Sequence, residues 1–212
     1  MTSAVFFDLD GTLVDSDSAR DAAVRAMVDG DDVVDLWRNL EDKYFDAYLA
    51  GEISHAEQRR RRVADLHAAL KRPVREDWFD DYLTAYEDAW SAFSDAAPTL
   101  AVLKTRVGVL TNGRHDQQHA KLLASGLRSA VEALITSHEL GVAKPAAAAF
   151  AAACDAFGLA PSEVVYVGDR LDVDAQAACD AGLRGIWLNR TDAVAAAAVE
   201  TICSLHELPA LI

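Results

Sequence analysis

AVFFDLDGTL, residues 4–13, is the stretch that decides the fold of this chain. Its apolar run ends in a carboxylate, and a DGT turn follows directly. A short, fully apolar run bounded by a turn is typical of a strand buried on both faces of a parallel sheet. Similar runs recur at residues 106–113, 133–137, 163–169 and 184–189. The sequence therefore predicts a core of parallel strands.

Helical patterns separate the later runs. They cover about residues 116–123, the stretch that begins at Pro145, and residues 173–181, and each is followed by a glycine. Proline early and glycine late is the usual punctuation of a helix. Strands that alternate with helices of this length predict an α/β fold, with a Rossmann-like, doubly wound sheet.

Residues 16–97 break this alternation. They are rich in charged residues and helix formers and contain no convincing buried strand, so they predict a helical insert between the first and second strands. Pro98 marks the return to the core. The predicted domains are a catalytic core of residues 1–15 and 98–212 and an α-helical cap of residues 16–97.

Composition narrows the classes of partner and location. The chain has 212 residues and a formal net charge of −14, which disfavours binding to nucleic acid polymers and anionic membranes. It contains no apolar run of spanning length, and its first residues lack the pattern of a secretory signal. We therefore expect a cytoplasmic protein with a small-molecule partner. The sequence leaves the oligomeric state open.

Polar side chains end three of the predicted strands. Asp8 and Asp10 end the first, Thr111 and Asn112 the second, and Asp169 a later one. The carboxyl ends of parallel strands form the ligand-binding edge of an open α/β sheet, so these side chains are expected to converge. Carboxylates gathered there would form the oxygen cage that Mg²⁺ prefers.

Four motifs of this chain resemble the signature motifs of the haloacid dehalogenase-like hydrolase superfamily, in the same order. They are DLDGTLVDS (8–16), LTNG (110–113), AKP (143–145) and GDRLDVD (168–174). The resemblance covers the chain outside the insert. It implies a Rossmann-like sheet, a helical cap between the first and second motifs, and the phosphatase branch that carries such a cap.

The resemblance also implies catalytic roles. Asp8 resembles the nucleophile that forms an aspartyl-phosphate. Asp10 resembles the general acid that protonates the leaving oxygen and then deprotonates the attacking water, which requires Asp10 to be protonated in the first step. Lys144 resembles the cation that screens the nucleophile and binds phosphate.

Substrate and metal positions follow from the same motifs. Thr111 resembles the residue whose hydroxyl holds a phosphoryl oxygen, beside the backbone N–H groups of Asn112 and Gly113. The implied cofactor is Mg²⁺. By resemblance, its ligands are Asp8, the backbone carbonyl of Asp10 and Asp169. Asp174 is the second acid of the fourth motif and is expected in the outer shell of the metal, with direct coordination as the alternative. Asp172 is expected to be a solvated carboxylate at a helix start.

The leading hypothesis is a magnesium-dependent phosphatase for a small metabolite, such as a sugar phosphate, a phosphoglycolate-like acid or a nucleotide monophosphate. A phosphomutase on the same core, a haloacid dehalogenase and a non-catalytic binding protein are the alternatives. The dehalogenases of the superfamily lack the second aspartate of the first motif, so Asp10 argues against that activity.

The predicted cap contains no motif that defines a substrate. Arg59 to Arg62 form a basic run within a helical pattern, which predicts a solvated, ion-paired face. The alternative is that one of these arginines reaches the crevice and binds a carboxylate or second phosphate of the substrate. His67 is expected at the surface. Ala146 and Ala147 stand where many relatives carry an Asp-Pro pair, which weakens assignment to a subgroup.

Overall fold

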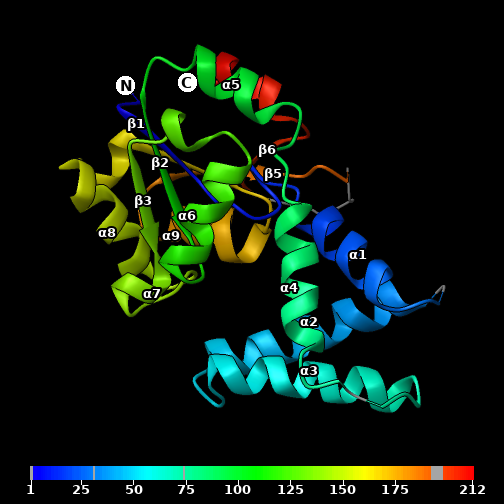
Figure 1. Cartoon of the computed structure of the whole chain (residues 1–212). Coiled ribbons are helices and arrows are strands. Elements are labelled where there is room, and N and C mark those ends of the chain that lie inside the picture. The colour runs from blue at the N-terminus through cyan, green and yellow to red at the C-terminus, as the bar shows by residue number, and fades with distance from the viewer. Residues whose placement is uncertain (1, 31, 74, 192–197) are drawn as a thin grey trace. The chain divides into compact units, whose positions relative to one another are not determined.

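The chain forms two compact units in the computed structural model, which describes residues 2–30, 32–73, 75–191 and 198–212 (Figure 1). The sheet unit consists of Met1–Ser16 and Trp90–Ile212, and the helical unit of Asp17–Ala89. The helical unit is therefore inserted after the first strand of the sheet unit.

The chain rejoins the sheet unit at Trp90, earlier than the return at Pro98 that the sequence predicted. Two backbone hydrogen bonds explain the difference. The Asp15 N–H donates to the Ser91 carbonyl at 2.9 Å, and the Phe93 N–H donates to the Leu13 carbonyl at 3.0 Å. These bonds fasten the returning chain to the loop after the first strand, and such pairing is not visible in composition.

The described part of the sheet unit contains a six-stranded sheet in the order β3-β2-β1-β4-β5-β6, and each neighbouring pair is parallel. The strands are β1 (Ala4–Phe7), β2 (Arg106–Thr111), β3 (Ala133–Thr136), β4 (Val164–Gly168), β5 (Arg184–Leu188) and β6 (Glu200–Ile202). This confirms the predicted α/β fold, with β6 as an addition that the sequence did not predict.

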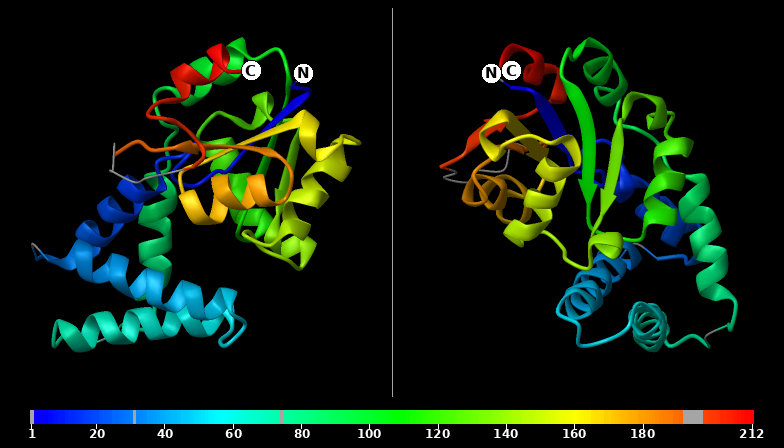
Figure 2. Two further views of the ribbon diagram at one scale, coloured as in Figure 1. Left: turned by 180° about the vertical axis from the view of Figure 1, so that it is seen from behind. Right: turned by 90° about the vertical axis from the view of Figure 1, so that its left-hand side faces the viewer.

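Helices cover both faces of the sheet (Figure 2). Val5 and Phe7 of β1 pack in one cluster with residues of α5 and α6, while Ala4 and Phe6 pack in the opposite cluster with residues of α8 and α9. Alternate side chains of a strand point to opposite faces, so the fully apolar run supplies both clusters. The helices of this unit are α5 (Ala96–Val102), α6 (His115–Ala124), α7 (Ser137–Leu140), α8 (Ala147–Phe157) and α9 (Gln176–Asp180).

The segment after β4 departs from the predicted single helix over residues 173–181. A π-helical turn, Leu171–Ala175, precedes the short helix α9. π-turns are rare and concentrate at functional sites, because the extra residue re-aims a side chain. Hydrophobic periodicity does not distinguish such a turn from an α-helix.

The helical unit contains α1, which begins at the junction (Ser16–Met27), α2 (Val33–Leu49), α3 (His55–Ala69) and α4 (Trp78–Asp88). Its core is aromatic: the indole N–H of Trp37 donates to the Tyr82 hydroxyl at 3.0 Å, and the Trp78 ring lies edge-on to Trp37. The aromatic side chains of this insert therefore form its own core.

The four consecutive arginines of α3 all contact residues of their own unit. Arg60 and Arg61 pair with Glu57, and Arg62 pairs with Glu41 at 2.8 Å while stacking over the Trp37 ring. Arg59 lies over the ring of Phe79. Arg62 is buried rather than solvated, because its guanidinium covers an aromatic face.

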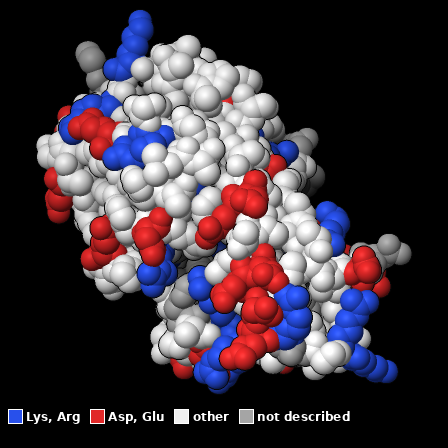
Figure 3. All heavy atoms as spheres, viewed as in Figure 1, with Lys and Arg blue, Asp and Glu red and all other residues white. Residues whose placement is uncertain are grey.

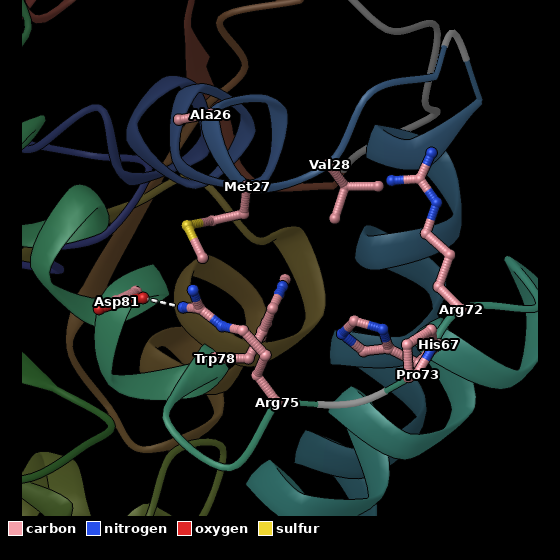
Figure 4. Close-up of a pocket in the computed structure, with 9 residues that line it drawn as sticks. All are labelled: Ala26, Met27, Val28, His67, Arg72, Pro73, Arg75, Trp78 and Asp81. Carbon is pink, nitrogen blue, oxygen red and sulfur yellow. Dashed lines mark hydrogen bonds and ion pairs between the residues drawn. The ribbon is translucent and has the colours of Figure 1, made fainter.

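A pocket of about 560 Å³ lies within the helical unit (Figure 4). His67 lines it and is buried against Trp78, so the surface position expected from the sequence is wrong. The residue is on the face of α3 that packs on the N-terminal turn of α4. Arg75, at the same pocket, is ion-paired with Asp77 and Asp81.

Acidic and basic side chains are interspersed on the face shown in Figure 3, and no broad basic area is visible there. The absence of such an area from this face agrees with the formal net charge of −14. Of the helices in the described parts of the chain, none combines the length and the apolar character needed to cross a bilayer.

Candidate active site

The loop after β1 carries the first two acidic residues of the site. Asp8 continues the strand, since its N–H donates to the Val167 carbonyl of β4 at 2.9 Å, and its side chain is buried. Gly11 then takes φ +81°, a left-handed conformation that L side chains rarely adopt. A Cβ on Gly11 would lie 2.5 Å from Asp169 Oδ2, so glycine also makes room for that carboxylate.

Lys144 lies at the centre of the site. Its ammonium group donates to Asp8 Oδ1 at 2.8 Å, to Asp174 Oδ1 at 2.6 Å and to the Tyr166 hydroxyl at 2.7 Å. The lysine side chain is only 3% exposed, and its three donors have three acceptors. Burial acts to lower the pKa of Lys144, but the charges of Asp174 and Asp8 outweigh it and raise the pKa, so the lysine is a fixed cation.

Three carboxylates meet beside this lysine. Oxygen atoms of Asp8, Asp169 and Asp174 all lie within 4.8 Å of one another. Burial, followed by the charge of Asp174, raises the pKa of Asp169 to about 6. Burial also raises the pKa of Asp8 well above its usual value, against the opposing effect of Lys144. Three ionised carboxylates and one ammonium group carry a net charge of −2. A divalent cation that prefers oxygen ligands therefore fits this set of donors.

Asp174 is held by the chain on both of its oxygens. Besides accepting from Lys144, it accepts a hydrogen bond from the Arg170 N–H at 3.1 Å through Oδ2. The π-turn directs this side chain back over β4, where a Cβ on Gly168 would lie 2.4 Å from the Asp174 carboxyl carbon. These contacts suit a residue that orients Lys144 and lies in the outer coordination shell of a bound metal ion.

The end of β2 brings the second motif to the same place. The Thr111 hydroxyl is buried and accepts a hydrogen bond from Gln118 at 3.0 Å. The Asn112 side chain holds the backbone of Lys144 on both sides, accepting from its N–H and donating to its carbonyl, each at 2.9 Å. The Gly113 N–H donates to Ser137 Oγ at 2.9 Å, so it already has a partner in this state of the protein.

Two side chains from α6 hold Asp10. Lys121 Nζ lies 2.5 Å from Asp10 Oδ1, and Gln118 Nε2 lies 2.9 Å from Asp10 Oδ2. Burial acts to raise the pKa of Asp10, but the charge and hydrogen bond of Lys121 and the hydrogen bonds of Gln118 and Ser16 lower it overall. This direction is opposite to the one that a protonated general acid requires.

Sequence reasoning did not identify Gln118, Lys121 or Tyr166 as members of this group. Tyr166 was part of an apolar strand pattern, and its hydroxyl instead donates to the Leu110 carbonyl at 2.8 Å while accepting from Lys144. Gln118 and Lys121 lie three residues apart on the buried side of α6. A polar pair at helical spacing soon after Thr111 was the available signal.

The carboxylates of Asp8, Asp169 and Asp174 thus lie together beside Lys144. Gln118 links Thr111 to Asp10, whose side chain is 29% exposed. Asp172 is 77% exposed and points away from this group, as expected for a solvated carboxylate. The arrangement offers an anionic oxygen, an ammonium group and a second, separately held carboxyl group in one site.

Comparison with known proteins gives a consistent result. A family model described as haloacid dehalogenase-like hydrolase matches residues 2–182. Among characterised proteins, the glyceraldehyde 3-phosphate phosphatase of Methanopyrus kandleri is 32% identical, over 90% of this chain and 85% of the relative. The match therefore includes both the sheet unit and the helical insert.

Solved structures share the architecture. The HAD-hydrolase YfnB of Bacillus subtilis, described as bound to magnesium, superposes with a TM-score of 0.85 at 20% identity and covers 99% of this chain and 98% of its own. L-2-haloacid dehalogenase from Xanthobacter autotrophicus gives 0.82 at 23% identity, covering 100% and 98%. At these identities the likeness shows the fold alone.

Proposed function

The chain belongs to the haloacid dehalogenase-like hydrolases, and we propose that it is a magnesium-dependent phosphatase that hydrolyses small phosphorylated metabolites through an aspartyl-phosphate on Asp8. The observation that carries the proposal is the gathering of the Asp8, Asp169 and Asp174 carboxylates, two of which, Asp8 and Asp174, pair with Lys144. Phosphoryl transfer depends on positioning and on neutralising negative charge, and this group supplies both.

The proposed reaction has two displacements at phosphorus. Lys144 holds Asp8 Oδ1, which leaves Oδ2 to attack: the bond from this oxygen to phosphorus forms as the bond to the leaving oxygen breaks. Asp10 donates its proton to the leaving oxygen. Asp10 then accepts a proton from a water molecule whose oxygen attacks the phosphorus, and the bond to Asp8 breaks to release inorganic phosphate.

The acid step requires protonated Asp10, whereas Lys121 lowers the pKa of this residue. An anionic phosphate ester bound beside Asp10 would raise that pKa, because a nearby negative charge disfavours the ionised carboxyl. We therefore expect the bound substrate to favour the protonated form of Asp10. Once the leaving group has departed, the ionised Asp10 is ready to act as a base, and Lys121 favours that form.

Asp8, Asp169 and the backbone carbonyl of Asp10 are the proposed ligands of Mg²⁺, and Asp174 is proposed to act from the outer shell. When bound, the cation supplies charge neutralisation to the phosphoryl group. Asp169 is also set in place by the Thr12 hydroxyl, which donates to it at 3.2 Å. This contact fixes the carboxylate before any ligand arrives.

Asp169→Asn is expected to weaken Mg²⁺ binding by at least about 100-fold, since an anionic ligand is replaced by a neutral one. Isothermal titration calorimetry measures this independently of turnover. Because the pKa of Asp169 is about 6 without the cation, protons compete with Mg²⁺ below that pH. The affinity of the wild-type protein for Mg²⁺ should therefore increase from pH 5 to pH 7.

Asp172→Asn makes the same change at an exposed carboxylate nearby and is the matched control. We expect it to bind Mg²⁺ with the affinity of the wild-type protein. Equal Mg²⁺ affinities of Asp169→Asn and Asp172→Asn would exclude Asp169 as a ligand.

The substrate class rests on the relatives and on charge. The Methanopyrus relative is named for a three-carbon phosphate ester, and a site of this charge balance suits a small phosphate monoester such as a sugar phosphate, a phosphoglycolate-like acid or a nucleotide monophosphate. In the helical unit, the four consecutive arginines are engaged with residues of that unit. We therefore expect other side chains to select the substrate.

A panel of phosphate monoesters, assayed with Mg²⁺ and with EDTA, tests the proposal. We expect Mg²⁺-dependent release of inorganic phosphate, with the preferred ester ranked by kcat/KM. The same panel should include an L-2-haloacid, assayed without added metal for halide release, and a sugar monophosphate with its bisphosphate activator, assayed for isomerisation. Halide release or isomerisation in the absence of phosphate release would replace the proposal with a dehalogenase or a phosphomutase, and folded protein inactive on all substrates would indicate a binding protein.

A further inference from the structure

The buried side of α6 carries two polar side chains that are directed at Asp10. Lys121 is 5% exposed and lies 2.5 Å from Asp10 Oδ1, and Gln118 is buried and lies 2.9 Å from Asp10 Oδ2. A lysine is rarely buried unless it is paired, because burying an ammonium group is costly. The position of Lys121 therefore depends on Asp10, and that of the Asp10 carboxyl on Lys121.

Gln118 extends this contact to the strand that carries the second motif. Its Nε2 also lies 3.0 Å from Thr111 Oγ1 and 3.1 Å from the Asn112 carbonyl. Gln118 and Lys121 are one helical turn apart, so both side chains extend from one face of α6 and each contacts one carboxylate oxygen of Asp10. The ammonium group of Lys121 also lies 5.6 Å from the centre of the Trp90 ring.

We propose that Lys121 and Gln118 are positioning residues that fix the Asp10 carboxyl for proton transfer to the leaving oxygen and tie its orientation to Thr111. The proposal rests on the proposed phosphatase function. The Asp10 side chain, in the loop after β1, rotates about two bonds and is 29% exposed. Without the two contacts from α6, the hydrogen bond of Ser16 would be left to orient the carboxyl, which would then sample several orientations. A displacement of about 1 Å from the productive geometry costs about 100-fold in rate.

This role predicts that the effect of a substitution depends on the leaving group. An alkyl phosphate expels an alkoxide, which requires a proton as the bond to phosphorus breaks. An aryl phosphate such as p-nitrophenyl phosphate expels a stabilised anion, which leaves without one. The value of kcat/KM covers only the steps up to formation of the aspartyl-phosphate, so hydrolysis of that intermediate does not enter the comparison.

The experiment compares Lys121→Met with the wild-type protein on p-nitrophenyl phosphate and on the best alkyl phosphate of the panel, both with Mg²⁺. We expect kcat/KM to fall by about 100-fold on the alkyl ester and by less than about 5-fold on the aryl ester. Lys121→Arg, which keeps the charge, should recover a large part of the loss on the alkyl ester. Gln118→Leu should show the same dependence on the leaving group with a smaller amplitude.

Lys104→Met is the matched control, because Lys104 is an exposed lysine of the same unit. Thermal unfolding of each variant checks the fold, and Lys121→Arg and Gln118→Leu keep the test valid if Lys121→Met unfolds. Equal losses of kcat/KM on the two esters, or full activity of Lys121→Met on the alkyl ester, would contradict the positioning role and leave the proposed function standing. Wild-type protein that hydrolyses neither ester would overturn the proposed function, and the inference with it.

Discussion

Asp8→Asn is expected to lower kcat/KM for every phosphate ester by about 10⁴-fold or more, because the amide offers no anionic oxygen to attack phosphorus. The substitution preserves shape, and Lys144 keeps its contacts with Asp174 and Tyr166. The loss should therefore reflect chemistry rather than unfolding. Steady-state assays on the preferred ester give the magnitude, and thermal unfolding confirms that the variant is folded.

A second measurement identifies the covalent step. Rapid acid quenching during turnover, followed by mass spectrometry, should yield a phosphorylated peptide that contains Asp8 from the wild-type protein and none from Asp8→Asn. Asp172→Asn makes the same change at an exposed carboxylate and should retain activity. If Asp8→Asn turned over within about threefold of wild type, a difference of about 0.65 kcal/mol, the nucleophile would have to be another residue.

Lys144→Met is expected to reduce activity by about 10³-fold, because it removes the cation that lies against both the nucleophile and Asp174. The same change leaves two buried carboxylates without their partner. Breaking a buried ion pair from one side costs about 3–5 kcal/mol of folding free energy at neutral pH. Urea unfolding of the metal-free protein measures this loss, and Lys104→Met provides the control at an exposed lysine.

The destabilisation should depend on pH in a defined direction. Burial raises the pKa of Asp8 in the folded protein, and removing Lys144 takes away the main effect that lowers it. A carboxyl group whose pKa is higher in the folded state binds its proton more tightly there, so the folded state gains stability as the pH falls toward the ordinary value of about 3.9. Lys144→Met should therefore be closer to wild type at pH 5 than at pH 8, and a deficit that grows on acidification would contradict this account.

The sheet was predictable from the sequence because its strands are short apolar runs with clear ends. β1, β2 and β4 lie within one or two residues of the predicted ranges, and each is followed by a polar residue of the site. β6 (Glu200–Ile202) was not predicted, since three residues of which only Ile202 is buried give no periodic signal. The helical insert was recognised by the absence of such runs. Its C-terminal boundary was placed at Pro98, whereas the chain rejoins the sheet unit at Trp90.

The sequence predicted which residues belong to the site better than it predicted the contacts between them. Asp8 and Asp169 directly follow β1 and β4, so strand ends and motifs both located them, whereas Lys144 was located only by the resemblance of its AKP motif. The contacts of Gln118 and Lys121 with Asp10 were not predictable, since a polar pair on one helix face usually points to solvent. Their direction depends on how α6 packs on the sheet, which is a tertiary property. His67 was misplaced for the same reason.

The central position of β1 between β2 and β4 has a consequence for biosynthesis. β1 is synthesised before both of its neighbours in the sheet, which begin only at Arg106 and Val164. The nascent chain must therefore keep an apolar strand unpaired while the helical unit, whose contacts are local, is already complete. Long-range pairing of this kind slows folding and exposes strand edges to aggregation. The topology therefore delays the pairing of β1 on both of its edges until the residues of β4 have been synthesised.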